Sequence, residues 1–88
     1  MRFTWDPRKA AANLRKHHVT FDEAMTVFVD PLALVTGDAI HVERSVIIGE
    51  SIRPRVLLTV FVERDDEEIR IISARRATSR ERRDYESR

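Results

Sequence analysis

The amino-acid sequence predicts an α+β domain in which a small antiparallel β-sheet carries two early helices on one face and is followed by a carboxyl-terminal helix. Capping-box patterns at residues 20–23 and 78–81 mark helix starts on either side of a strand region. In that region, residues 45–49, 56–62 and 69–74 form apolar runs separated by turn-forming residues. Because short connections favour antiparallel neighbours, we expect the order β-α-α-β-β-β-β-α.

The first helix follows a short expected strand at residues 3–5. Asp6 is a favourable N-cap and Pro7 suits the first helical position, so the helix is predicted to run from there to about His17. Its expected apolar stripe contains Ala10, Leu14 and His17. A separate polar stripe contains Lys9, Asn13 and Lys16.

The second helix is predicted to start at Thr20 and to end at Asp30–Pro31. Its apolar residues are Phe21, Ala24, Met25 and Phe28, which follow the i, i+3, i+4, i+7 spacing of a helix packed on a core.

The strands are expected at residues 32–36 and then at the three apolar runs. The runs 45–49 and 56–62 lack alternation, which is typical of central strands covered on both faces. The terminal helix is polar on nearly every side, so we expect it to lie on the surface or to dock through few contacts.

Length and composition indicate one domain, residues 1–88, with a modest core. Hydrophobic residues make up 42% of the chain and charged residues 35%, which indicates a folded domain with an ionised surface. The chain has no cysteine, and no apolar run approaches the roughly 18 residues of a membrane span. We therefore expect a cytoplasmic protein with no membrane association.

Charge is distributed unevenly although the net charge is only +1. The first 20 residues carry five basic and one acidic side chain, and residues 70–88 carry seven basic and three acidic ones. Residues 21–51 carry one basic and six acidic side chains. If the fold brings the two ends together, they form a positive field suited to phosphate.

Arg70, Arg75 and Arg76 are the candidates for binding and neutralising a phosphate, because the guanidinium group is permanently charged and matches phosphate oxygens. Strand alternation places Arg70 and Arg76 on one face and Arg75 on the other, unless a bulge occurs near Ser73. The alternative is that one of these arginines braces the terminal helix or a carboxylate such as Glu81.

Candidates for proton transfer are His17 and Tyr85. Histidine gives and takes protons near neutral pH, but the position of His17 also fits a ring packed on the helix stripe. Tyr85 shares a helix face with Glu81 and fits either base stacking, proton donation or anchoring of the helix. The sequence leaves the alternative roles of each residue open.

Lys9, Lys16 and Trp5 are candidate RNA contacts. The lysines can bind phosphate or lie solvated, and Trp5 can stack on a base or pack in the core. A metal site is not expected, because adjacent histidines diverge by about 100° on a helix. His17 and His18 are such a pair, and His41 is remote in sequence.

Several motifs together resemble the BrnT family of toxins from bacterial type II toxin–antitoxin pairs. They are Trp5-Asp6, Lys9, Asn13, Lys16-His17, Val19, Phe21, Glu23-Ala24, Phe28, Asp30-Pro31, Glu43-Arg44, Gly49, Arg70-Ile71-Ile72-Ser73-Ala74-Arg75-Arg76-Ala77, Glu81 and Tyr85. The resemblance implies a RelE-like fold and cleavage of RNA without a metal or other cofactor. It also adds Arg44 to the expected RNA contacts.

The resemblance further implies inhibition of translation and growth, and neutralisation by a BrnA-like antitoxin. Toxin and antitoxin would form a mixed oligomer, expected as 2:2, that binds its own promoter DNA through the antitoxin. The residues by themselves support an alternative: a non-catalytic module that binds RNA, DNA or an acidic protein through the same arginines.

Two positions depart from the family pattern. His18 stands where the family usually has glycine, and a histidine takes a left-handed helix end only with some strain. The loop at residues 51–55 also lacks a glycine that is common there.

Overall fold

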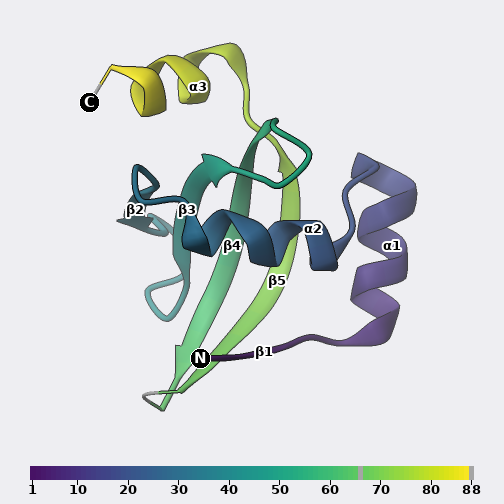
Figure 1. Cartoon of the computed structure of the whole chain (residues 1–88). Coiled ribbons are helices and arrows are strands. Elements are labelled where there is room, and N and C mark those ends of the chain that lie inside the picture. The colour runs from purple at the N-terminus through teal and green to yellow at the C-terminus, as the bar shows by residue number, and fades with distance from the viewer. Residues whose placement is uncertain (66, 88) are drawn as a thin grey trace.

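One mixed sheet organises the fold in the computed structural model, which describes residues 1–65 and 67–87 (Figure 1). The elements are β1 (Arg2–Thr4), α1 (Pro7–His17), α2 (Phe21–Met25), the 3₁₀ helix η1 (Thr26–Val29), β2 (Leu34–Gly37), β3 (Ser45–Glu50), β4 (Val56–Arg64), β5 (Glu68–Arg76) and α3 (Ser79–Glu86). The strand order across the sheet is β1-β5-β4-β3-β2. The predicted α+β class and element order are confirmed.

The pairing of β1 differs from a fully antiparallel sheet. Each strand from β2 to β5 pairs antiparallel with the next strand along the chain. β1 instead runs parallel to β5, with Phe3 opposite Ile69. These two strands are the first and the last along the chain. No short turn joins them, so nothing in the connection requires an antiparallel arrangement.

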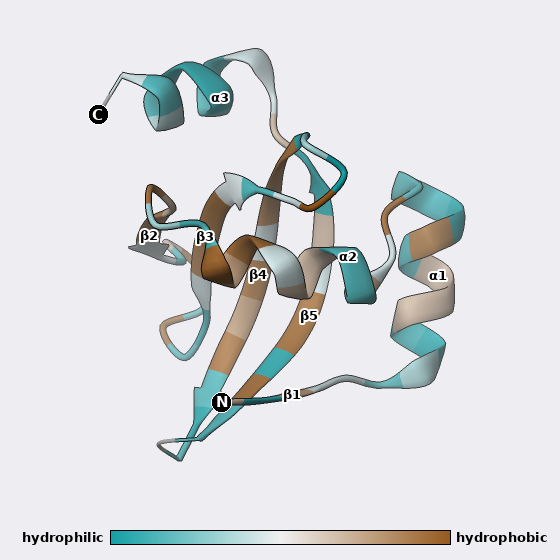
Figure 2. Ribbon diagram, in the orientation of Figure 1, coloured by the Kyte–Doolittle hydropathy of each residue, from teal (hydrophilic) through white to brown (hydrophobic). Residues whose placement is uncertain are grey.

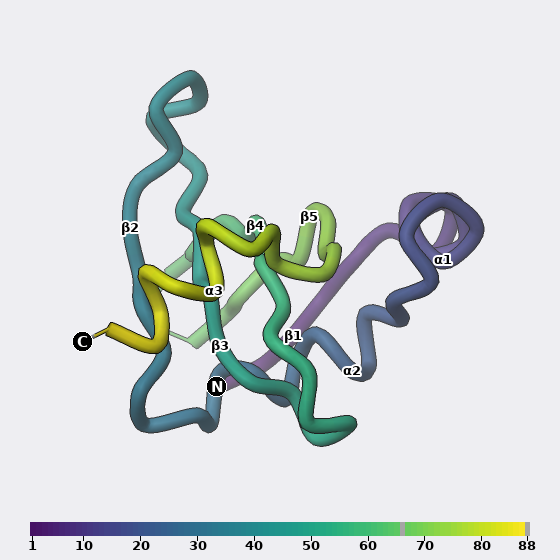
Figure 3. The backbone as a smooth tube through the Cα atoms, turned by 90° about the horizontal axis from the view of Figure 1, so that it is seen from above, coloured from purple at the N-terminus to yellow at the C-terminus, as the bar shows by residue number. Residues whose placement is uncertain are grey.

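The core lies between the sheet and the α2–η1 segment, which crosses one face (Figures 1 and 3). We call this the core face. It buries Leu57, Thr59 and Phe61 of β4, while the intervening residues Leu58 and Val60 are only partly buried. The expectation that the central strands are covered on both faces is therefore wrong for β4, whereas in β3 the adjacent residues Ile47 and Ile48 are both buried. The opposite face, which we call the open face, has apolar residues but no helix across it in the views of Figures 1 and 3.

A β-bulge in β5 changes the face on which each later side chain lies. Val60 pairs with Ser73 and Phe61 pairs with Ile71, so Ile72 is an extra residue in β5. Ala74 consequently returns to the core face and is fully buried. Arg70 and Arg75 lie opposite Val62 and Leu58, and all four share the open face.

Asn13 attaches α1 to the free edge of β5. β1 pairs only with residues 68–70, so Ala74 has no strand beside it on that edge. The Asn13 Nδ2 group donates to the carbonyls of Ala74 (2.8 Å) and Val19 (3.0 Å), and Asn13 Oδ1 accepts from the Ala74 N–H (3.0 Å). One side-chain amide thus replaces a missing strand neighbour.

The predicted apolar stripe of α1 is wrong at Leu14 because of this contact, whereas Ala10 packs against the core. Asn13 is 6% exposed, whereas Leu14 is 46% exposed. The helix turns its amide toward the sheet edge because the buried backbone of β5 needs hydrogen-bond partners.

The helices begin and end as the capping patterns predict, except around α2. His18 adopts the left-handed conformation (φ 59°), and its N–H donates to the Leu14 carbonyl (2.9 Å), so the helix ends there without a glycine. The Thr20 hydroxyl caps α2 by accepting from the Glu23 N–H (3.0 Å). The Glu23 carboxylate, however, turns to Ser51 and Arg55, and α2 continues as η1 after Met25.

Gly49 allows η1 and the turn after it to lie close to β3. A Cβ atom at this position would be 3.2 Å from the Val27 carbonyl oxygen and 3.3 Å from Asp30 Oδ2. That Asp30 oxygen accepts from the Glu50 N–H (2.8 Å). The glycine therefore lets a carboxylate bind the end of β3.

Helix α3 crosses the end of the sheet where β5 and β3 finish (Figure 1). Its capping box is complete, with Thr78 and Glu81 bonded reciprocally, and none of its described residues is buried. Arg75 pairs with Glu81, and the Tyr85 hydroxyl donates to Asp30 Oδ2 (2.5 Å). Few contacts hold the helix, and they lie at its two ends. In the described residues no helix combines the length and the apolarity needed to cross a membrane.

Replacing Asn13 with alanine should lower the free energy of unfolding by about 2–4 kcal/mol, because buried backbone groups of Ala74 lose their partners. Urea denaturation followed by circular dichroism measures this. Arg15→Ala, at an exposed position of the same helix, is the control and should change stability by less than about 0.5 kcal/mol. Equal effects of the two changes would show that the Asn13 contact does not hold α1.

Candidate functional site

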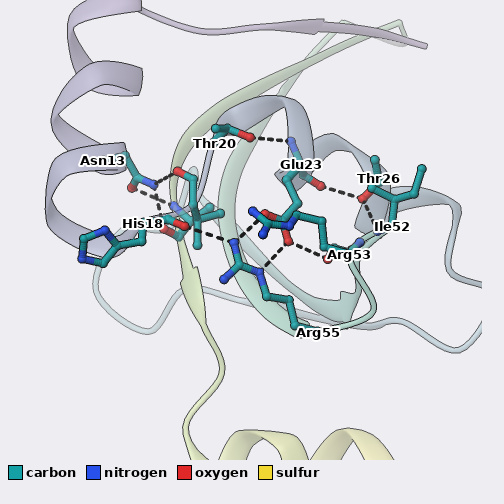
Figure 4. A network of polar contacts seen from close by, with 11 residues as sticks. Asn13, His18, Thr20, Glu23, Thr26, Ile52, Arg53 and Arg55 are labelled. Carbon is teal, nitrogen blue, oxygen red and sulfur yellow. Dashed lines mark hydrogen bonds and ion pairs between the residues drawn. The ribbon is translucent and has the colours of Figure 1, made fainter.

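The first of the polar clusters that lie outside the hydrophobic core surrounds Glu23 (Figure 4). The Glu23 side chain is 4% exposed. Its carboxylate accepts from Ser51 Oγ (2.7 Å), Arg55 Nε (2.8 Å) and Arg55 Nη2 (2.7 Å). This is a buried, bidentate ion pair with an additional hydroxyl donor.

The surroundings of this pair are also bonded. Arg55 Nη2 donates to the His18 carbonyl (3.0 Å), which links the end of α1 to the loop between β3 and β4. Thr26 Oγ1 accepts from the Ile52 N–H of the same loop (2.9 Å). Hydrogen bonds from Arg55 lower the pKa of Glu23 and raise that of Arg55, so both groups are ionised. Since every charge is satisfied, this cluster holds the loop in place rather than offering a site for a ligand.

The same loop explains one departure from the family pattern. Among the described residues, positive φ angles occur only at His18 and Asp65. The loop at residues 51–55 therefore contains no left-handed position, and it has no need of a glycine.

The second cluster is a concavity of about 200 Å³ between α1 and the bulge of β5. Its lining residues are Lys9, Ala12, Asn13, Lys16, His17, Ile72 and Ser73. We call it the basic concavity, because two lysines and a histidine meet there without a carboxylate among the lining residues. His17 is partly buried and both lysines are exposed.

The basic concavity adjoins the open face, on which Arg70 and Arg75 lie. Their partners Val62 and Leu58 are four residues apart in β4, so the two arginine backbones are about 13 Å apart. Arg70 Nη1 donates to Thr4 Oγ1 (3.4 Å) near the β1 end of this face. The bulge is the exception that the sequence left open near Ser73: Arg70 shares the open face with Arg75, and Arg76, opposite buried Leu57, lies on the core face.

Arg75 makes the bracing contact that the sequence left as an alternative. Its Nη1 and Nη2 donate to Glu81 Oε1 and Oε2, both at 2.9 Å. This bidentate pair lowers the pKa of Glu81 and raises that of Arg75. The Arg75 side chain remains 37% exposed, so it still reaches the surface beside the open face.

The other sequence candidates lie elsewhere. Tyr85 donates to Asp30 at the end of the sheet, and Trp5 packs edge-to-face on Phe21 with ring centroids 5.8 Å apart. Trp5 faces a stripe of α1 different from that of Lys9 and Lys16. Arg44 lies in the β2–β3 connection, at the sheet edge remote from α1. The structure does not bring these three residues to the basic concavity.

Two polar lining residues are not among the site residues that the sequence predicts. The sequence places Asn13 on the polar stripe of α1, and Ser73 has no motif of a catalytic serine around it. A signal for Asn13 was available: its side chain is the only uncharged polar group on the Lys9–Asn13–Lys16 stripe. Within residues 1–65 and 67–87, no three His, Cys, Asp or Glu side chains gather as metal ligands would.

A small α+β domain with a basic concavity beside an uncovered sheet face has the charge and shape for an anionic ligand. A comparison with known protein families agrees with a small domain that binds an anionic ligand. Residues 5–81 match the family model described as the ribonuclease toxin BrnT of type II toxin–antitoxin systems. The chain therefore belongs to the BrnT family of ribonuclease toxins.

A solved structure agrees with this assignment. The crystal structure of the Brucella abortus ribonuclease toxin BrnT superposes with a TM-score of 0.74 at 25% sequence identity. The match covers 90% of this chain and 99% of the Brucella chain. A comparison with curated protein sequences gave no match. The resemblance found in the sequence is thus confirmed, as is the fold that it implied.

Glu23→Gln should destabilise the protein by about 2–4 kcal/mol at pH 7, because the partly buried Arg55 loses its counter-charge and the buried side chain at position 23 loses its ionic hydrogen bonds. Folding lowers the pKa of Glu23, so the ionised carboxylate stabilises the folded protein at pH values above its ordinary pKa of 4.5. That contribution disappears as the pH falls through the lowered value. Unfolding measured between pH 7 and pH 3 should show the two proteins converging in acid.

The control is Glu63→Gln, at an exposed position of β4. It should follow the wild-type stability at each pH. A constant difference between Glu23→Gln and wild type down to pH 3 would contradict the assigned role of the ion pair.

Proposed function

We propose that this protein is an endoribonuclease that cleaves RNA without a metal, at the basic concavity between α1 and β5. The observation that carries this proposal is the meeting of Lys9, Lys16 and His17 of α1 with Ser73 of β5 around one cavity. These groups come from segments about 60 residues apart in the sequence and include both phosphate-binding and proton-transferring side chains. Membership of a ribonuclease toxin family supports the reaction.

The open face would hold the RNA strand. Lys9 and Lys16 provide exposed positive charge at the edge of this face, and Arg70 and Arg75 provide it along β5. The apolar side chains of Leu58, Val60 and Val62 form a surface on which bases can pack. Arg76 is not part of this arrangement because the bulge places it on the core face.

Cleavage would proceed by attack of the 2′-oxygen on the neighbouring phosphorus. A bond forms between these atoms and the bond from phosphorus to the 5′-oxygen breaks, which leaves a 2′,3′-cyclic phosphate and a free 5′-hydroxyl. His17 is the group that takes the 2′-proton, and a protonated side chain or water supplies the proton to the leaving oxygen. Lys9 and Lys16 stabilise the added negative charge on the phosphate oxygens.

A site rich in cations supports the metal-independent form of this reaction. Lysine and arginine side chains repel a divalent ion and perform the charge neutralisation that such an ion would supply. Arg75, although bound to Glu81, keeps the Nε–H donor and part of its surface.

The cellular consequence would be inhibition of translation and growth. The family's placement in type II systems supports a protein antitoxin as partner. We propose a BrnA-like antitoxin that forms a 2:2 complex with this chain and binds the promoter DNA of the pair.

The double change Lys9→Ala/Lys16→Ala should reduce RNA cleavage at least tenfold and lower the salt dependence of RNA binding, because two phosphate contacts are lost. The matched control is Arg8→Ala/Arg15→Ala, which removes the same charge from α1 outside the cavity lining. Cleavage is measured with purified protein and labelled RNA in EDTA. Equal losses in both pairs would indicate a general charge effect and contradict the assigned site.

His17→Ala should reduce the cleavage rate about 10²-fold while RNA binding changes little, because proton transfer is lost and the lysines remain. His41→Ala, in the β2–β3 connection, is the control and should cleave as wild type. If His17→Ala cleaves normally, another group is the base. If wild-type protein cuts no RNA in EDTA, with or without ribosomes, and merely retains it in a salt-dependent way, the protein is a binding module.

A further inference from the structure

A second hollow lies away from the basic concavity, on the side of η1. It has a volume of about 580 Å³, within the range of sites that hold substantial ligands. Its apolar lining comes from β1, α2, η1 and the loops beside them: Phe3, Met25, Val29, Pro31 and Ile52. We call it the η1 groove.

Apolar side chains also surround the groove at high exposure. Val29 is 83% exposed and Ile52 is 76% exposed. Leu32, which follows the groove residue Pro31, is 64% exposed. In the ribbon of Figure 2, hydrophobic residues colour η1 and part of the segment that leads to β2. Large apolar side chains gathered at this exposure mark a surface that another molecule covers.

The charge of the groove is acidic. Its two charged lining residues are Asp30 and Glu50. Residues 21–51, which form most of this side, carry six acidic side chains and one basic one. An apolar, acidic groove repels the phosphates of RNA, so this surface is not an extension of the cleavage site.

The helices of this chain do not suit the groove. α3 is polar along its whole length, and the exposed side of α1 offers Leu14 as its single large apolar side chain. A second copy therefore has no apolar helix face to insert. A helix that fills the groove would therefore come from a different chain.

We propose that the η1 groove binds an amphipathic helix of the antitoxin, with large aliphatic residues at i, i+3 or i+4 and i+7 facing the groove and lysine or arginine at the helix flanks. The aliphatic residues would fill the apolar lining, and the basic flanks would face Asp30 and Glu50. This proposal rests on the proposed antitoxin partnership. It assigns inhibition to a surface separate from the basic concavity.

The test uses the full chain and the antitoxin encoded beside it, with affinity measured by titration calorimetry. Val29→Arg and Ile52→Arg should each weaken binding at least tenfold, because they place a positive charge and a polar group in the groove. Ile40→Arg and Val42→Arg are matched controls, since these residues are 84% and 96% exposed in the β2–β3 connection. The controls should bind as wild type.

A synthetic peptide tests the chemistry of the occupant independently. A 16-residue helical peptide with leucines at the stated spacing and lysines elsewhere should bind wild-type protein, and Glu50→Lys should weaken that binding at least tenfold. A peptide with glutamates in place of the lysines should bind at least tenfold more weakly. Equal binding of the two peptides would overturn the predicted basic flanks.

Cleavage of RNA by the same variants separates this proposal from the enzymatic one. Val29→Arg and Ile52→Arg should cleave RNA as wild type in the absence of antitoxin. If both bind antitoxin with wild-type affinity, the docking surface is wrong whether or not the protein cleaves RNA. If the free protein is a dimer that Val29→Arg dissociates, a second copy occupies the groove and the proposal is likewise overturned.

Discussion

The hydrogen bonds between the Asn13 amide and the backbone of Ala74 fix the position of α1 relative to β5. β1 is too short to pair with the whole of β5, and the amide completes the edge that β1 leaves bare. Because a buried backbone group without a partner is costly, the position of α1 along β5 is strongly determined. Lys9, Lys16 and His17 are placed beside Ser73 as a result.

The bulge at Ile72 acts together with this contact. It lets Ala74 point its side chain into the core while Arg70 and Arg75 remain on the open face. Strand β5 therefore contributes residues to both the buried core and the basic surface. A shift of one residue in this strand would move the arginines to the opposite face, so the bulge is as important to the site as the charged residues themselves.

The molecule presents two surfaces of opposite character. Cations surround the basic concavity beside the open face, whereas carboxylates and aliphatic side chains form the η1 groove. The Glu23–Arg55 pair lies between α2 and the β3–β4 loop and holds that loop, which carries Ile52 of the groove. Helix α3 touches both regions, since Arg75 and Asp30 are its contacts. One small fold thus keeps an anion-binding surface apart from an apolar one.

The sequence alone was sufficient for the α+β class, the element order and the caps at Thr20 and Thr78, because these depend on local patterns of apolar and capping residues. Membership of the BrnT family was indicated separately, by the resemblance of motifs along the chain. The sequence also identified Lys9, Lys16, His17 and the arginines of β5 as candidates, since their chemistry is inherent in the side chains. It did not show that β1 pairs parallel with β5, that Leu14 faces solvent, or that Arg75 binds Glu81. Those outcomes depend on contacts between distant segments and on one extra residue in a strand, and neither leaves a periodic signal in the chain. Only the tertiary structure decided which of these charged groups share a surface, because a hydrogen bond from Asn13 and the bulge at Ile72 set the faces.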